Sequence, residues 1–222
     1  MKYHPMARFP LRFSSIFWTR HDVEHDESEV FKCFESNVII VADDAEGVPL
    51  MIAAKKHETI LRRGRAYRIE GQVAAGGRNS ISTVFEDVVN TIAIDQAEVR
   101  VNALVNKVSA HGVGQIVDWD LRSASEEGCY NEVIKVLHWC TGSSGERVEF
   151  HANWLINAQV AESISGDALC AGNVIGLRGN VTGFLSRDNT WEIQVTEILL
   201  VQCELKRRQS RRQQGLSPAT SE

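Results

Sequence analysis

The sequence lacks CxxC pairs, long apolar runs and the short motifs that mark common enzyme classes. Its five cysteines are odd in number and have no metal-ligand spacing, which argues against a disulfide framework and a zinc site. No apolar stretch approaches the roughly 20 residues that a membrane-spanning helix needs. The P-loop, GxSxG and HExxH motifs are missing, so we expect a non-catalytic protein that uses no cofactor or metal.

Basic residues are scarce in most of the body of the chain. Residues 103–205 hold six Lys and Arg against 13 Asp and Glu, a net charge of −7, so a phosphate backbone would meet repulsion there. Residues 55–78 are the exception. They hold seven basic residues and two acidic ones, and we expect them to contact phosphates, with a solvated face as the alternative: Lys55, Lys56, Arg62, Arg63, Arg65, Arg68 and Arg78.

The two ends of the chain are also basic. Residues 1–20 contain four basic residues and no acid, which is typical of a mitochondrial transit peptide, so we expect a leader there and a mitochondrial protein. The alternative is a first strand, because Phe9, Leu11 and Phe13 alternate with other residues. Residues 206–222 predict a disordered basic tail that contacts RNA or acidic partners, or only solubilises the chain, through Lys206, Arg207, Arg208, Arg211 and Arg212.

A glycine phrase occurs twice in the chain. Gly64 and Gly71 are repeated as Gly172 and Gly179, 108 positions later, within alternating strand-like segments. A second pair of segments follows each phrase, residues 84–94 and 190–200, and aligns at an offset of 106 with Phe85 matching Trp191. Two matches in the same order indicate an internal duplication.

The alternating, β-branched segments predict strands, and a glycine inside such a strand marks a bend that helps to close a barrel. In the second copy, three strand candidates precede a short helix at residues 157–165 and two further strands. This β-β-β-α-β-β order is the plan of an oligonucleotide/oligosaccharide-binding (OB) barrel. We therefore predict an all-β fold with a short helix and two tandem OB-like barrels, a reduced one at residues 28–100 and a fuller one at residues 103–205.

Residues 103–201 resemble the single-stranded DNA-binding proteins of the bacterial and mitochondrial type. The segments that carry the resemblance are VNKVSAHGVGQI, VEFHANWLINAQVAES and AGNVIGLRGNVTG. In that family, aromatic rings on the barrel stack on bases. The resemblance implies stacking roles for Trp139, Phe150 and Phe184, with core packing as the alternative for each.

The segment AGNVIGLRGNVTG is also similar to the OB-fold interaction subunits of the kinetoplastid mitochondrial RNA-editing complex. That second resemblance implies a non-catalytic scaffold that contacts single-stranded RNA and other OB-fold subunits. The acidic body and the thin set of stacking residues favour it. The alternative is a mitochondrial binder of single-stranded DNA or RNA that acts in replication or nucleic-acid protection.

Overall fold

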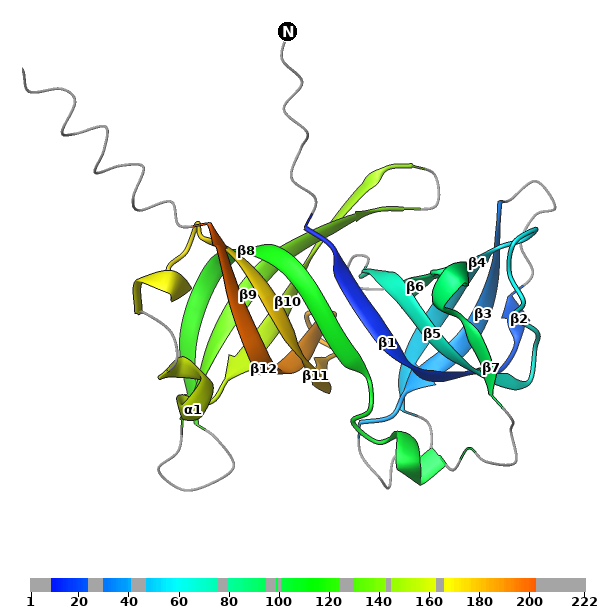
Figure 1. Ribbon diagram of the computed structural model, residues 1–222, viewed down its shortest axis with the longest axis horizontal. Coiled ribbons are helices and arrows are strands. Elements are labelled where there is room, and N and C mark those ends of the chain that lie inside the picture. The colour runs from blue at the N-terminus through cyan, green and yellow to red at the C-terminus, as the bar shows by residue number, and fades with distance from the viewer. Residues whose placement is uncertain are drawn as a thin grey trace, which may run out of the picture.

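The computed structural model describes residues 9–23, 30–40, 47–75, 80–94, 99, 101–123, 130–142, 145–162 and 166–202, and it shows two β-barrels side by side (Figure 1). The first barrel contains β1 (Leu11–Thr19), β2 (Asp22–Val23), β3 (Phe31–Val38), β4 (Val48–Lys55), β5 (Arg65–Ala74), β6 (Ser82–Glu86) and β7 (Ile92–Ile94). The second contains β8 (Ser109–Ser123), β9 (Tyr130–Thr141), β10 (Arg147–Ile156), α1 (Ala158–Ala161), β11 (Val174–Leu185) and β12 (Thr190–Gln202). The predicted all-β class with a short helix is confirmed.

The second barrel closes in the order expected for an OB fold. β8 pairs with β9 and β9 with β10, both antiparallel, and β10 then pairs with β12 in parallel. β12 pairs with β11, and β11 returns to β8, which closes the barrel. The helix α1 connects the third strand to the fourth, and its first turn is capped by Asn157, whose side chain accepts a hydrogen bond from the Val160 N–H at 2.9 Å.

The first barrel repeats this plan without the helix. β3 pairs with β4, β4 pairs in parallel with β6, β6 pairs with β5, and β5 pairs with β1. β1 and β2 share the role of the first strand, because β1 pairs with β5 whereas β2 pairs with β3. Between β4 and β5, residues 56–64 form a turn and a loop. The missing helix agrees with the prediction of a reduced first copy.

The expected leader overlaps this first strand, and here the structure corrects the expectation. Residues 11–19 form β1, with Leu11, Phe13 and Phe17 buried inside the barrel. A leader ending at residue 20 would therefore remove a strand that fills the core, and the alternative of a strand holds for these residues. The first barrel accordingly begins at β1 rather than at residue 28. Residues 1–8 and the basic tail at 206–222 lie outside the described residues.

The two barrels are joined by their first strands, which run beside each other at the centre of Figure 1. Residues 11–14 of β1 pair antiparallel with residues 109–112 of β8. Phe13 lies opposite Gly71 in the first barrel, Ala110 lies opposite Gly179 in the second, and Phe13 and Ala110 lie opposite each other. Phe13 and Ala110 thus occupy equivalent positions in the two barrels and lie opposite each other. An approximate twofold axis between the barrels produces this relation.

The pairing of the last strands corrects the offset of the second repeated segment. Val84 lies opposite Val73 in the first barrel, whereas Ile193 lies opposite Val181 in the second. Val73 and Val181 are 108 apart, as predicted, but Val84 and Ile193 are 109 apart. The predicted offset of 106 matched Phe85 to Trp191, yet Phe85 lies next to the inward-facing Val84 and points outward. The error arose because two apolar alternating strands align at several offsets.

Trp191 is a buried residue of the contact between the barrels. Its equivalent at the corrected offset is Ser82, and its indole Nε1–H donates to the Ser82 Oγ at 3.0 Å. The Phe13 ring and the indole pack edge to face, with 5.4 Å between centroids and 86° between planes. Trp191 is fully buried, so it is a structural residue of this contact.

Candidate nucleic-acid interface

OB barrels commonly bind oligonucleotides on the outer face of their second and third strands. In the second barrel that face is formed by β9 and β10, and Trp139 lies on it, half-buried. The Arg147 guanidinium lies over the Trp139 ring, 4.6 Å from its centroid, and also forms an ion pair of 2.6 Å with Glu149. Trp139 is therefore on the face where a stacking residue was expected, but one side of its ring already carries an arginine.

The cleft beside this face is acidic. It has a volume of about 200 Å³ and lies between the β8–β9 hairpin and the turn that joins β11 to β12. Three carboxylates line it, Asp118, Asp120 and Asp188. Of its two basic residues, Lys135 and Arg122, the second is paired with Glu192 at 2.6 Å. Phosphates gain affinity from uncompensated cations, and this cleft offers few.

Two of the aromatic residues predicted to stack on bases serve the core instead. Phe150 is 6% exposed and packs near the His138 ring, with 5.8 Å between centroids. Phe184 packs against Trp191 at 4.6 Å between centroids. The prediction for Phe150 is corrected to core packing, because a buried ring presents no face to a base. Phe184 is half-buried and packs against the core cluster.

His138 is a buried polar residue behind this face. Its Nδ1 donates to the Val113 carbonyl oxygen at 3.0 Å, and its Nε2 accepts from the Trp154 Nε1–H at 3.2 Å. Both ring nitrogens are thus used by a neutral imidazole with its proton on Nδ1. Complete burial lowers the pKa of His138 to about 4, because a charged ring would lose its hydration. His138 is a structural residue of the second barrel.

The first barrel is also acidic over its full sequence, but its basic residues gather in one segment. Residues 9–94 hold ten Lys and Arg against 13 Asp and Glu, and seven of those ten basic residues lie within residues 55–78. Lys55 and Lys56 stand at the end of β4, and Lys55 forms an ion pair of 3.1 Å with Glu58. Arg68 is exposed on β5. Arg78 lies outside the described residues, as do the five basic residues of the tail.

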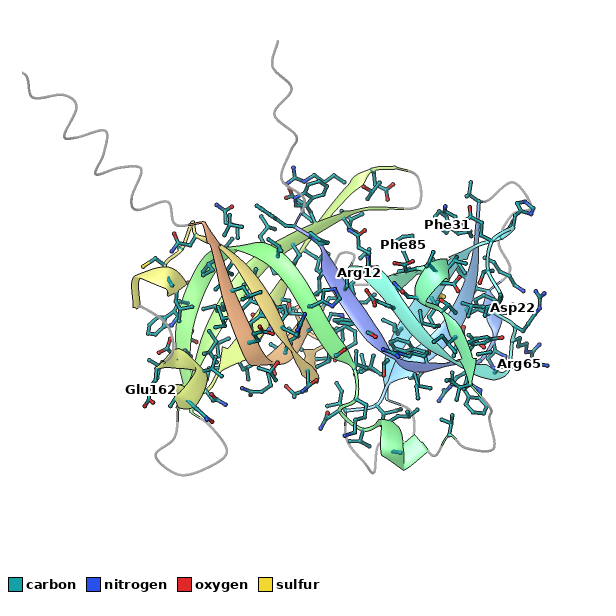
Figure 2. All side chains as sticks on the ribbon, in the orientation of Figure 1. Arg12, Asp22, Phe31, Arg65, Phe85 and Glu162 are labelled. Atoms are coloured by element: carbon teal, nitrogen blue, oxygen red, sulfur yellow. The ribbon has the colours of Figure 1, made fainter. Side chains whose placement is uncertain are left out.

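Residues 62–65, which we term the arginine turn, hold three exposed arginines on a fixed backbone. The Thr19 hydroxyl donates to the Arg62 carbonyl oxygen at 2.6 Å, and the Arg62 N–H donates to the Tyr67 hydroxyl at 2.9 Å. Gly64 adopts a positive φ of 71°, which the tight turn requires and which a residue with a Cβ rarely adopts. Figure 2 places Arg65 on the side of the first barrel away from the second. The Arg62, Arg63 and Arg65 side chains are therefore presented together from a preformed turn.

An exposed tryptophan lies beside the arginine turn. Trp18 is 36% exposed and lies opposite Ala66 on the outer face of β1 and β5. Two positions earlier, Ile16 lies opposite Arg68 on the same face. The combination of a ring and several guanidinium groups suits a nucleic-acid strand, because the ring stacks on bases and the cations contact phosphates. Trp18 was missed from the sequence because it was assigned to a leader.

A second aromatic group lies on the outer face of β3, β4 and β6, the face that corresponds to the OB binding face. The Phe31 and Phe85 rings meet edge to face at 5.5 Å, and Figure 2 shows them together on the first barrel. Lys55 lies opposite Phe31 in the β3–β4 ladder, and the small Ala53 lies opposite Phe85. Both phenylalanines are half-buried. The sequence offered no motif that distinguishes them from core residues.

The described part of the chain contains neither a metal-binding cluster nor a membrane-spanning helix. Among these residues, no three or more His, Cys, Asp and Glu side chains are grouped so that they could hold a metal ion. Asp118 and Asp120 are exposed on the β8–β9 hairpin. The described helices are all too short or too polar to cross a membrane.

Comparison with known proteins supports the fold. No family model and no curated protein matches the sequence. A solved deletion mutant of the single-stranded DNA binding protein from Thermus aquaticus matches with a TM-score of 0.53 and 9% identity, over 89% of this chain and 97% of that one. A replication protein A heterotrimer bound to single-stranded DNA matches with a TM-score of 0.23 and 10% identity, over 94% of this chain and 52% of that one. The first match extends the likeness to single-stranded DNA-binding proteins across both barrels, as a likeness of fold.

Proposed function

We propose that this protein binds single-stranded nucleic acid without catalysis and that the first barrel carries the interface. The observation that carries the proposal is the arginine turn, whose three exposed guanidinium groups sit on a hydrogen-bonded backbone next to the exposed Trp18 ring. Such cations neutralise phosphates while the ring stacks on bases. The fold shared with a single-stranded DNA binding protein supports the same function.

Binding to fluorescein-labelled 30-mers of single-stranded RNA and DNA tests this proposal by fluorescence anisotropy. We expect Trp18→Ala to weaken binding about 5-fold or more, because base–aromatic stacking contributes about 1–3 kcal/mol per base. The matched control is Trp119→Ala, since Trp119 is 46% exposed on the acidic hairpin of the second barrel. Equal affinities of the wild type and Trp18→Ala, or an equal loss in both variants, would contradict the proposal.

We further propose that the second barrel docks protein, as a scaffold subunit of a mitochondrial RNA-processing complex of the RNA-editing kind. The observation that favours this role is the acidic cleft, together with the Trp139 ring that carries the Arg147 guanidinium on one face. The arginine turn of the first barrel would hold single-stranded RNA, while the acidic cleft of the second barrel would contact another OB-fold subunit. The competing role is a plain single-strand binder in replication or nucleic-acid protection, which needs no such partner.

Affinity purification of the tagged chain, with and without nuclease treatment, separates these two roles. A scaffold keeps its protein partners after nuclease, and the triple variant Asp118→Asn, Asp120→Asn, Asp188→Asn loses them because the acidic cleft is neutralised. A plain single-strand binder loses all partners when the nucleic acid is digested. The mitochondrial location is tested by imaging the chain with a C-terminal fluorescent tag, with and without residues 1–8, which precede β1. A signal confined to the cytosol in both cases would contradict it.

A further inference from the structure

The first strand of the first barrel changes neighbours along one edge. β8 pairs with β1 as far as Ser14, and on the same side the Arg20 N–H donates to the Glu35 carbonyl oxygen of β3 at 2.8 Å. From residue 15 to residue 19, β1 has no strand partner on this edge among the described residues. The alternation of a strand points the N–H and C=O of Ile16 and Trp18 to this edge, as it does those of Arg20.

The segment that leads into β8 covers this unpaired part of the β1 edge. The Asn106 N–H donates to the Ile39 carbonyl oxygen at 3.0 Å, and the Ser15 hydroxyl donates to the Lys107 carbonyl oxygen at 3.2 Å. These contacts tie the segment to residue 39 and to the Ser15 side chain, and a cavity of about 210 Å³ lies beside it. The cavity lies within the described residues, beside β1 and β3.

The lining of this cavity is apolar with polar groups at selected points. Ile16, Ile39 and Leu104 contribute apolar surface. Asn37 contributes an amide, which can donate and accept hydrogen bonds at once. The partly exposed Trp18 and the exposed Arg20 also line it. An apolar site with a few polar groups is the usual composition of a pocket that binds a small organic group.

The corresponding gap in the second barrel is closed by the chain itself. There, Pro10 accepts a hydrogen bond from the Val113 N–H of β8 at 3.0 Å, and Phe9 accepts one from the Trp139 N–H of β9 at 2.9 Å. The Pro10 carbonyl approaches so closely that a Cβ on Gly112 would lie 2.8 Å from it. Among the described residues, this gap is therefore open in the first barrel and filled by residues 9 and 10 in the second.

We propose that this cavity receives one unstacked base of the bound nucleic-acid strand and reads its edge through Asn37. The inference rests on the proposed function and names the site at which that function becomes selective for a base. Trp18 and Arg20 flank Thr19, whose hydroxyl holds the arginine turn. A nucleic-acid strand whose phosphates lie on the arginine turn therefore passes beside the cavity. The amide of Asn37 and the strand edge of β1 then supply hydrogen bonds that differ between bases.

The test measures the affinity of the full chain for labelled 12-mers of oligo(A), oligo(C) and oligo(U) RNA. We expect the wild type to prefer one of the three about tenfold, because a good base-edge contact is worth about 1–3 kcal/mol. Asn37→Ala should abolish the preference and keep general affinity, and Leu104→Trp should fill the cavity and weaken the preferred oligomer. The matched controls are Asn180→Ala and Leu199→Trp, at exposed positions of the second barrel.

The outcomes separate this inference from the function on which it rests. If the triple variant Arg62→Ser, Arg63→Ser, Arg65→Ser binds all oligomers as well as the wild type, the proposed interface is wrong. If that variant binds weakly while Asn37→Ala and Leu104→Trp keep the wild-type ratios, the interface stands and the cavity is not a base site. Equal wild-type affinities for the three oligomers would also overturn the inference. Loss of the preference in both cavity variants, with unchanged controls and melting temperatures, supports it.

Discussion

Lowering the pH from 7 to 4 should cost this protein about 3 kcal/mol of folding stability through one side chain, His138, because complete burial lowers its pKa from 6.5 to about 4. The unfolded chain binds a proton near pH 6.5, whereas the folded chain resists protonation until about pH 4. Between these values the unfolded state holds more protons, so stability falls as the pH falls. The same relation gives a loss of about 2 kcal/mol at pH 5.

The geometry explains why the folded state resists the proton. The Nε2 of His138 accepts the Trp154 Nε1–H at 3.2 Å, and a proton on Nε2 would set two donors against each other. Partial burial also lowers the pKa of His111 and His151, so the wild type shows the sum of several contributions. A difference between variants isolates the contribution of His138.

Urea denaturation at pH 7, 6, 5 and 4.5 measures this effect as a free energy of unfolding. His138→Gln keeps a neutral donor and acceptor at the site, so its stability should depend on pH less steeply than that of the wild type by about 2 kcal/mol between pH 7 and 5. His57→Gln, at an exposed position, serves as the control. If His138→Gln and the wild type lose the same stability over this range, the reasoning about the buried imidazole is refuted.

Three further predictions follow from single contacts. Gly179→Ala should destabilise the second barrel by more than about 1 kcal/mol, since the new Cβ would overlap the Gln194 carbonyl, and an unchanged urea midpoint would contradict this. Trp191→Phe should lower the free energy of unfolding by about 1–3 kcal/mol, because the buried Ser82 hydroxyl loses the indole N–H that donates to it. Thermal denaturation measures this loss, with Trp119→Phe as the control. Burial raises the pKa of Cys140 to about 11, so iodoacetamide at pH 8 should modify it only after unfolding, as mass spectrometry of native and denatured samples would show.

The glycine phrases were the part of the sequence that predicted the fold best. Gly71 and Gly179 occupy equivalent places where the neighbouring strand carbonyl leaves no room for a Cβ. Such a constraint acts on one residue type, so it is visible in a single sequence. The alternation around each glycine then predicted strands, and the strand order predicted the barrel.

The alignment of the last strands could not be predicted in the same way. An apolar residue at every second position satisfies a strand at several offsets, and only the ladder between Val84 and Val73 fixes the offset at 109. Residues 11–19 were also ambiguous in the sequence, for a different reason. Their composition is typical of a leader, but their alternation places Leu11 and Phe13 in a barrel core. Composition and periodicity pointed to different structures, and periodicity determined the outcome.

The candidate interface was predicted in part. The basic stretch led to Arg62, Arg63 and Arg65, because an excess of one charge is a property of the sequence itself. The aromatic residues were harder, since Phe150 and Phe31 occupy similar apolar strands and differ only in the side of the sheet that they face. Trp18 reaches the arginine turn through the pairing of β1 with β5, a contact between residues far apart in the sequence. No local pattern records that pairing.

The salt dependence of binding tests the central claim most directly. The affinity for a 30-mer of single-stranded RNA is measured between 50 and 300 mM salt, for the wild type and for the variant with serines at positions 62, 63 and 65. Each phosphate contact on a single strand contributes about 0.7 to the slope of log affinity against log salt, so the variant's slope should be smaller by about 2. The control replaces Lys135, Arg178 and Arg187 of the second barrel by serine, an equal change in charge, and should keep the wild-type slope. An unchanged slope in the first variant, or an equal reduction in both, would contradict the assignment of the interface to the first barrel.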